Sequence, residues 1–289
     1  MEWVNAVVQG LFLGGSYALL ACGLSLMFGV MKIVNLAHGA LAVVAAYLAL
    51  SLIEHTGMPA FATLLVVVPV FAVVGYAMQR GLLNRALKFG ELSPLLVTFG
   101  LAVIIANGLQ QLWSADSQAI KIGALSTASF QPGADLSVGL FPLLTLVVAV
   151  VVISAIQLFL ARTRTGRAMR ATRDDGDAAR LMGIDDRHLY GVAAAIAVAT
   201  VALAGVFLGM STQFTPTYGD LVLIFAFEAV IIGGLGSLWG TLLGGLVLGI
   251  AQTVGAQLNP ADGILAGHLV FLAILLLKPS GLFPKAVPA

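Results

Sequence analysis

Charged residues are scarce in this 289-residue chain, since aspartate, glutamate, lysine and arginine together make up only 9% of it. A soluble domain carries about 25% charged residues, so this composition excludes an ordinary soluble protein. The net charge is only +1, which gives no case for binding nucleic acid or another polyanion. Cysteine occurs once, as Cys22 in an apolar run, so no internal disulfide can form.

Patterns of catalytic or metal-binding residues are also missing. The chain has four histidines, at positions 38, 55, 188 and 268, and their spacing is not that of metal ligands. No nucleophile, base and orienting group occur together. The N-terminus has neither the basic segment nor the cleavage site of a secretory signal, so we expect it to begin a retained span. The sequence therefore predicts neither an enzyme nor a metal-binding protein.

Hydrophobic residues make up 60% of the chain, and charged residues cut it into pieces of similar length. A transmembrane helix needs about 20 apolar residues. We expect such helices at Trp3–Met31, Ile33–Ile53, Pro59–Met78, Leu92–Trp113, Val138–Ala161, Leu189–Ser211 and Ile264–Leu277. The apolar run Leu221–Leu258 is too long for one simple span and is expected to break near Gly233–Gly240. The predicted fold is an all-α polytopic transmembrane helical bundle of eight or nine spans, in one domain over residues 1–289.

Basic residues concentrate in two of the predicted loops. Arg80, Arg85 and Lys88 lie between the third and fourth spans, and seven arginines lie between the fifth and sixth. Two spans separate these loops, so both lie on one side, which the positive-inside rule assigns to the cytoplasm. The N-terminus is then outside. The C-terminus is cytoplasmic if the broken region crosses twice or re-enters and returns; counted as one span, it leaves the C-terminus outside.

The one long polar stretch of the chain covers residues 162–188. Asp174 and Asp175 are suited to capping the start of a helix, and Gly183 is suited to ending it. Between them we expect a short helix of about two turns whose apolar residues, at positions 178, 181 and 182, share one face. Such a helix could dock into a groove of another protein. The alternative is a solvated loop whose arginines only set the orientation of the chain.

Glu228 lies inside an apolar run, where a carboxyl group costs a few kcal/mol unless it is paired, protonated or beside a cavity. It is therefore a functional candidate, unless it lies nearer the interface or bonds to free backbone amides. Gly233, Gly234 and Gly236 indicate non-helical backbone, which at membrane depth lies inside protein or beside a water-filled cavity. Tight helix packing alone is the other reading. No strand precedes these glycines and no lysine follows them, so they do not form a phosphate-binding loop.

Asn35 and His38 are three residues apart at the start of the predicted second span, beside Lys32. Polar side chains at this position could cap the helix or line the mouth of a path through the membrane. A lone histidine is more often a hydrogen-bonded structural residue than a ligand or a proton carrier, and both readings stay open.

Three motifs, in this order, give the chain a family resemblance: VNLAHG at residues 34–39, TRTGRAMRATRDDGDAARLMGID at 163–185 and FEAVIIGGLGSLWGTLLGGLVLG at 227–249. Together they resemble the membrane permease subunits of ABC importers for branched-chain amino acids. The likeness runs from about Gly10 to Gly281. Each motif alone is weak, whereas three in the same order and spacing are specific.

The resemblance implies a multi-pass permease of the bacterial inner membrane. Its expected partners are a second homologous permease subunit, two cytoplasmic ATPases, a periplasmic substrate-binding protein and membrane lipid. The loop at 162–188 would hold the coupling helix that sits in an ATPase groove, formed by Asp177, Ala178, Ala179, Arg180, Leu181, Met182 and Gly183. The chain has no Walker motif, so ATP is expected only on partner chains and no cofactor on this one. The expected residues of the substrate path are Asn35, His38, Glu228, Gly233, Gly234 and Gly236.

Three alternatives to amino-acid import remain. The same architecture also serves urea and short amides, and the sequence does not separate these substrates. A stand-alone channel or ion-coupled carrier usually has paired intramembrane charges, whereas here Glu228 is the one charged residue clearly placed at depth. An intramembrane enzyme would need the catalytic residues that the sequence lacks.

Overall fold

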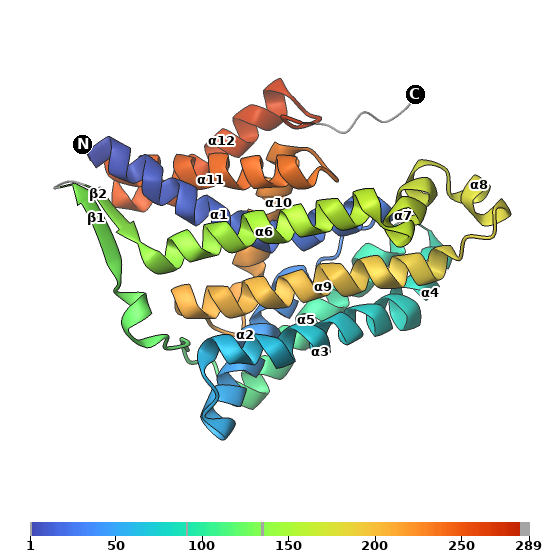
Figure 1. Ribbon diagram of the computed structural model, residues 1–289, viewed down its shortest axis with the longest axis horizontal. Helices are drawn as coiled ribbons and strands as arrows, with labels where there is room; N and C mark the ends of the chain where they lie inside the picture. Colours follow the sequence, from blue (N-terminus) through green and yellow to red (C-terminus); the bar gives the residue numbers. More distant parts are fainter. Residues whose placement is uncertain (1, 91, 134–135, 284–289) are drawn as a thin grey trace. The chain divides into compact units, whose positions relative to one another are not determined.

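The computed structural model describes residues 2–90, 92–133 and 136–283, and most of them are helical (Figure 1). The helices are α1 (Glu2–Met31), α2 (His38–Thr56), α3 (Leu64–Met78), α4 (Asn84–Ala86), α5 (Ser93–Trp113), α6 (Leu140–Arg162), α7 (Arg164–Asp174), α8 (Gly176–Leu181), α9 (Asp186–Ser211), α10 (Tyr218–Gly233), α11 (Leu238–Leu258) and α12 (Gly263–Leu277). Strands β1 (Ser129–Gly133) and β2 (Leu136–Gly139) form an antiparallel hairpin. This architecture confirms the predicted all-α fold.

Eight helical segments of the described chain are long and apolar enough to cross a membrane. They are Glu2–Met31, His38–Thr56, Ala60–Phe89, Ser93–Trp113, Leu140–Arg162, Asp186–Ser211, Leu238–Leu258 and Pro260–Leu277. Helix α10 is also apolar but has only 16 residues, about 24 Å at 1.5 Å per residue. The chain is therefore a polytopic membrane protein.

The helices gather into two compact units. The first unit comprises Met1–Ser25, Lys121–Ile153 and Ile224–Ala289, and the second comprises Leu26–Ile120 and Ser154–Leu223. Helices α1, α6 and α10 each begin in one unit and end in the other. The single permease domain over residues 1–289 stays a prediction.

In the first unit, α1 and α11 meet through glycines. A Cβ atom added to Gly14 would lie 2.5 Å from the Cα atom of Leu246, and Gly249 is in equally close contact with the backbone of Gly10. Glycine lets two helix backbones approach this closely in a membrane. The small residues of α1 and α11 therefore serve helix packing.

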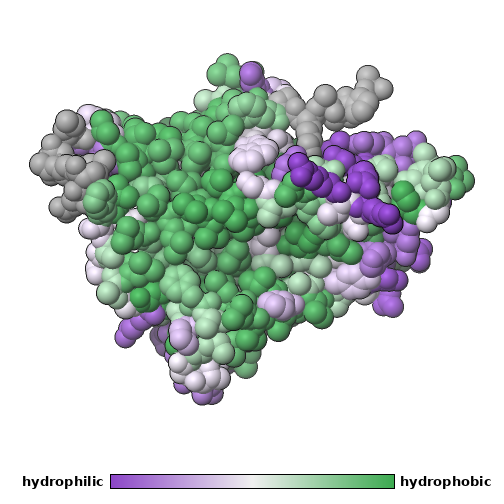
Figure 2. Space-filling model, in the orientation of Figure 1, coloured by the Kyte–Doolittle hydropathy of each residue, from purple (hydrophilic) through white to green (hydrophobic). Residues whose placement is uncertain are grey.

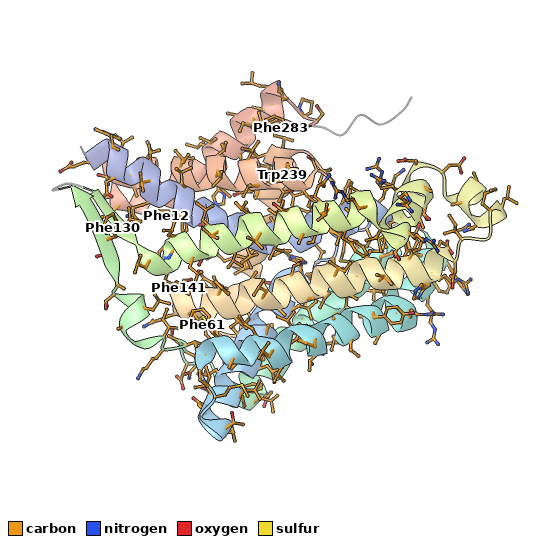
Figure 3. All side chains as sticks on the ribbon, viewed as in Figure 1. Phe12, Phe61, Phe130, Phe141, Trp239 and Phe283 are labelled. Atoms are coloured by element: carbon orange, nitrogen blue, oxygen red, sulfur yellow. The ribbon has the colours of Figure 1, made fainter. Side chains whose placement is uncertain are left out.

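In the second unit, α9 packs against both α2 and α3, and α3 runs beside it in Figure 1. Gly205 of α9 lies against the backbone of Ala42 in α2. Phe61, labelled in Figure 3, meets the ring of Phe207 edge to face with centroids 6.1 Å apart. The core of this unit is thus built around α9.

The predicted start of the second span, at Ile33, is wrong by five residues. Lys32 has a positive φ of 55° and leaves the helical conformation at the end of α1. The side-chain oxygen of Asn35 then accepts a hydrogen bond from the amide of Ala37 at 3.0 Å. This local turn competes with helix formation, so α2 begins only at His38.

Three other predicted boundaries also need correction. Helix α10 begins at Tyr218, three residues before the predicted apolar run Leu221–Leu258. The third span is predicted to end at Met78. The helical segment instead continues beyond Met78 through a π-helical turn, Gln79–Leu83, to Phe89. The hairpin precedes α6, which begins at Leu140 rather than Val138 because residues 136–139 pair with β1.

The predicted break in the apolar run Leu221–Leu258 is confirmed. Helix α10 ends at Gly233 and α11 begins at Leu238. Between them, Gly234 and Gly236 have φ values of 101° and 78°, a region that residues with a side chain adopt only at a cost. These two glycines therefore permit the turn between the helices.

The surface has the distribution of polarity expected of a membrane protein. Figure 2 shows apolar residues over α6 and α9, and hydrophilic residues gathered around α7. Large apolar side chains on α5 are exposed, including Leu96, Ile104 and Leu112. Exposed apolar side chains of this size are suited to contact with lipid.

Candidate functional site

Two groups of residues could carry function, and the first is the polar segment 162–188 of the second unit. It begins with α7, a helix that the sequence reading did not predict. The hydroxyl oxygen of Thr163 accepts a hydrogen bond from the amide of Gly166 at 2.9 Å and caps this helix. Gly166, Met169 and Thr172 form its buried face. Asp174 lies at the C-terminal end of α7, so its predicted role as a helix N-cap is wrong.

Helix α8 is the predicted short helix, and Asp175 caps its start. The Oδ1 atom of Asp175 accepts hydrogen bonds from the amides of Asp177 at 3.1 Å and Ala178 at 2.9 Å. Gly183 follows the helix with a φ of 81°, and its amide donates to the carbonyl of Arg180 at 2.9 Å. Both ends of α8 are therefore set by short-range interactions.

The predicted apolar face of α8 is exposed. Leu181 is 89% exposed and Met182 is 83% exposed, and Ala178 beside them is also exposed. Ala179 is only 5% exposed and packs inward. The residues available to a partner are therefore Ala178, Leu181 and Met182, whereas Ala179 belongs to the inner face of α8.

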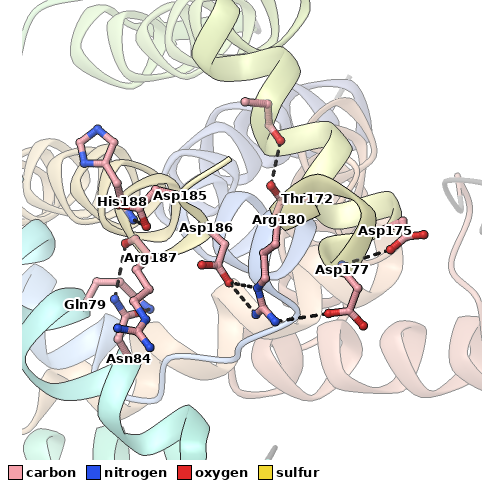
Figure 4. A network of polar contacts seen from close by, with 11 residues as sticks. Gln79, Asn84, Thr172, Asp175, Asp177, Arg180, Asp185, Asp186, Arg187 and His188 are labelled. Carbon is pink, nitrogen blue, oxygen red and sulfur yellow. Dashed lines mark hydrogen bonds and ion pairs between the residues drawn. The ribbon is translucent and has the colours of Figure 1, made fainter. Parts of the chain in front are cut away.

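Arg180 joins α8 to α9 (Figure 4). Its Nε and Nη2 atoms donate to Oδ2 of Asp186 at 2.8 Å and 2.6 Å, and Nη1 donates to Asp177 at 3.3 Å. The hydrogen bond with Asp186 raises the pKa of the Arg180 guanidinium. The side chain of Asp186 is only 14% exposed, and it lies in the first turn of α9.

The first turn of α9 is also hydrogen-bonded to α3 and to the short helix α4. The hydroxyl of Tyr76 lies 2.9 Å from Nδ1 of His188, and Arg80 donates to the same hydroxyl at 3.0 Å. The side-chain amide of Asn84 donates to the carbonyl of Arg187 at 3.4 Å. A continuous set of polar contacts therefore runs from α8 through the start of α9 to α3.

The second group of residues lies in the first unit and contains Glu228. Glu228 is 5% exposed, and its Oε1 atom lies 2.5 Å from Nδ1 of His268 on α12. Its Oε2 atom is buried and has no hydrogen-bond partner among the described residues. Glu228 is thus paired with a histidine 40 positions away, and pairing is one of the arrangements by which a carboxyl group inside an apolar run is compensated.

A second polar pair lies near Glu228 and His268. The hydroxyl of Tyr17 on α1 donates to Oε1 of Gln252 on α11 at 2.6 Å. The ring of Phe225 lies 4.8 Å from that of Tyr17 and 6.2 Å from that of His268, measured between centroids. Four helices of the first unit, α1, α10, α11 and α12, therefore contribute side chains to one cluster.

The remaining predicted path residues divide between the two units. Gly233, Gly234 and Gly236 lie at the α10–α11 turn of the first unit. Asn35 and His38 are fully buried in the second unit, where Asn35 stabilises the turn before α2. The amide of the intervening residue Leu36 donates to the hydroxyl of Thr98 at 3.0 Å.

Sequence reasoning missed His268, Gln252 and Tyr17. His268 and Gln252 are polar residues inside apolar runs, which was the signal that could have marked them. Their partners lie on other helices, so the pairings themselves could not be predicted from the sequence. Among the described residues no group of three or more histidine, cysteine, aspartate or glutamate side chains could hold a metal ion.

Comparison with known proteins gives the family. Residues 6–277 match the family model described as branched-chain amino acid transport system / permease component. The permease protein BraD of the high-affinity branched-chain amino acid transport system of Pseudomonas aeruginosa is 32% identical, over 98% of this chain and 96% of BraD. The corresponding LivH protein of Escherichia coli K12 is 26% identical over 99% of this chain and 96% of LivH. The probable LivH of Methanocaldococcus jannaschii is 29% identical over 91% of this chain and 87% of LivH.

The family model covers most of this chain, from α1 through the end of α12. It therefore spans both the exposed helix α8 and the buried pair formed by Glu228 and His268. BraD is similar over nearly the whole length of both chains. The chain belongs to the family of branched-chain amino acid transport system permease components.

Proposed function

We propose that this chain is the membrane-spanning permease subunit of an ABC importer for branched-chain or other apolar amino acids. The observation that carries the proposal is the match of residues 6–277 to the permease family, together with the transport systems named for BraD and LivH. Eight apolar helices suit a subunit that forms part of a path across the membrane. Import runs across the bacterial inner membrane, with the N-terminus outside.

The chain supplies the path, and partner chains supply ATP hydrolysis and substrate capture. A second homologous permease completes the membrane part, two cytoplasmic ATPases drive it, and a periplasmic binding protein delivers the substrate. Helix α8 docks into an ATPase through Ala178, Leu181 and Met182. The exposure of Leu181 and Met182 supports this role, since burying a leucine or methionine side chain contributes about 1.5–3 kcal/mol.

Transport follows from a change between outward-open and inward-open states. ATP binds the two states of the ATPases with different affinity, and that difference shifts the equilibrium of the permease. Glu228, Asn35, His38 and the backbone at Gly233–Gly236 line or gate the path. The buried, paired carboxylate of Glu228 supports this assignment.

Uptake of labelled substrate tests the proposal directly. The chain is reconstituted in proteoliposomes with its partner permease and ATPases, and substrate-loaded binding protein is added outside. We expect ATP-dependent uptake of leucine, isoleucine or valine. Uptake of urea or a short amide in their place would overturn the substrate assignment and keep the class of transporter. ATP-independent uptake by the chain alone would overturn the class.

The docking role of α8 has its own test. Leu181→Asp puts a carboxylate on the exposed apolar face, and we expect ATPase subunits to stop co-purifying with the permease. Ala171→Asp is the control, because Ala171 is an exposed alanine of α7 in the same loop. If the ATPases still co-purify with Leu181→Asp and hydrolysis stays substrate-stimulated, α8 is not the docking helix.

A further inference from the structure

Helix α8 is short, exposed and connected to α9 by only four residues, 182–185. One of them, Gly183, has a positive φ of 81°. A glycine in a short connection is free to change its backbone conformation. A force applied to α8 would be absorbed by this connection unless a second link ties α8 to α9.

That second link is the ion pair between Arg180 and Asp186 (Figure 4). Both Nε and Nη2 of Arg180 donate to one carboxylate oxygen of Asp186, at 2.8 Å and 2.6 Å. Asp186 is held in the first turn of α9 and its side chain is 14% exposed, whereas the side chain of Arg180 is 58% exposed. The pair therefore bridges the connection, with its anchored end on α9.

The start of α9 is itself fixed to α3 and α4. His188 and Arg187 bond to Tyr76 and Asn84 across 103 or more positions of the sequence. Helix α9 then packs along α2 and α3. A displacement that reaches Asp186 consequently reaches three helices of the second unit.

We propose that Asp186 is a positioning residue that makes α8 and α9 move as one body, so that ATPase motion is converted into movement of the helices. This inference rests on the proposed function and adds a residue that does not take part in docking. Asp186 is not on the exposed apolar face of α8. Without its carboxylate, Arg180 keeps its contact with Asp177, at 3.3 Å within α8 itself, so α8 stays folded but loses its ion pair to α9.

The test is Asp186→Asn in the complete transporter, with uptake and ATP hydrolysis measured in the same proteoliposomes. We expect the ATPases to co-purify as in the unaltered complex and basal hydrolysis to stay unchanged. Uptake per ATP hydrolysed should fall about fivefold or more, as for the weaker allosteric couplings. Asp186→Glu should restore most of the uptake per ATP, because it keeps a carboxylate in reach of Arg180.

Asp174→Asn is the matched control. It removes an ion pair of similar length, 2.7 Å to Arg173, that lies within α7 and bridges no connection. We expect it to leave uptake per ATP unchanged. In each pair one side chain is at least half exposed, at 58% for Arg180 and 50% for Asp174. Solvent screens such ion pairs, which contribute only about 0–1 kcal/mol to stability, so neither variant should unfold the chain.

Two results would overturn the inference. Unaltered uptake per ATP with Asp186→Asn would mean that the pair transmits nothing. Loss of the ATPases from the Asp186→Asn complex would mean that Asp186 shapes the docking surface instead. Failure of the proposed function looks different, because then the unaltered complex shows no ATP-driven uptake or Leu181→Asp keeps its ATPases.

Discussion

Glu228 and His268 show how a single carboxyl group is accommodated within an apolar helix. The carboxylate is buried, and one of its oxygens is bonded to the imidazole of His268. Removing one partner of a buried ionisable pair leaves the other without compensation. The stability of this region should therefore depend on both residues together.

We predict that His268→Ala destabilises the protein by about 1–3 kcal/mol, because it leaves the buried Glu228 without its hydrogen-bond partner. Thermal unfolding of the purified protein in detergent measures the change. The double variant His268→Ala with Glu228→Gln should be more stable than His268→Ala alone, since no carboxylate is then left unpaired. If the loss of stability in the double variant equals the sum of the losses in the two single variants, the two side chains do not interact directly.

Transport should also depend on the carboxylate of Glu228. We predict that Glu228→Gln inserts normally, because glutamine has almost the same shape, but lowers substrate uptake in vesicles. Insertion is measured by the amount of protein in the membrane fraction. Normal uptake by this variant would exclude a role for Glu228 in the path and leave it a structural residue.

At the scale of helices, close packing of α1 on α11 depends on the absence of side chains. A Cβ atom on Gly249 would collide with the backbone of Gly10 and Gly14. We predict that Gly249→Leu destabilises the protein by at least the roughly 1–3 kcal/mol of overpacking, and that it lowers the midpoint of thermal unfolding. Gly108→Leu is the control, since no atom lies within 4 Å of the Cβ position in α5.

The turn between α10 and α11 depends on glycine for a different reason. Gly236 has a φ of 78°, where any residue with a Cβ atom costs about 1–2 kcal/mol. We predict that Gly236→Ala lowers stability by that amount, as measured by thermal unfolding. Gly81→Ala is the comparison, because Gly81 has an ordinary φ and open space around it. Equal effects in the two variants would contradict a conformational requirement at Gly236.

For the whole molecule, the distribution of basic residues predicts the sides of the membrane on which the loops lie. We replace the buried Cys22 with alanine and introduce either Met182→Cys in the arginine-rich loop or Thr56→Cys at the end of α2. An impermeant thiol reagent applied to intact cells should label position 56 and not position 182. The reverse pattern would invert the topology and place α8 outside, where no cytoplasmic ATPase could reach it.

Several features of the fold follow from the sequence alone because they depend on neighbours along the chain. Apolar runs of about 20 residues predict the long helices without reference to their packing. Asp175 and Gly183 bound α8 through contacts that reach only a few residues. Gly234 and Gly236 predict the break between α10 and α11 for the same reason, and both have a positive φ in the structure. The family is also readable from three motifs in order, since their residues lie in continuous stretches.

Other boundaries could not be predicted, since they depend on competition between local turns and helices. Lys32 and Asn35 stop the backbone from continuing into α2, although the segment is apolar enough for a span. The capping side chain of Thr163 supports α7 in a segment that reads as a polar loop. In both places a few hydrogen bonds outweigh the hydropathy of the segment.

Only the tertiary structure decided which residues far apart in the sequence pair with one another. The carboxyl group of Glu228 pairs with His268. The carboxamide of Gln252 accepts a hydrogen bond from the hydroxyl of Tyr17, 235 positions away in the sequence. Ala179 is buried although it lies between exposed neighbours. The sequence by itself determined where the long apolar helices form, because backbone hydrogen bonds and hydropathy act locally. Which polar groups satisfy one another depends on how the helices pack, and packing joins residues without regard to their order in the chain.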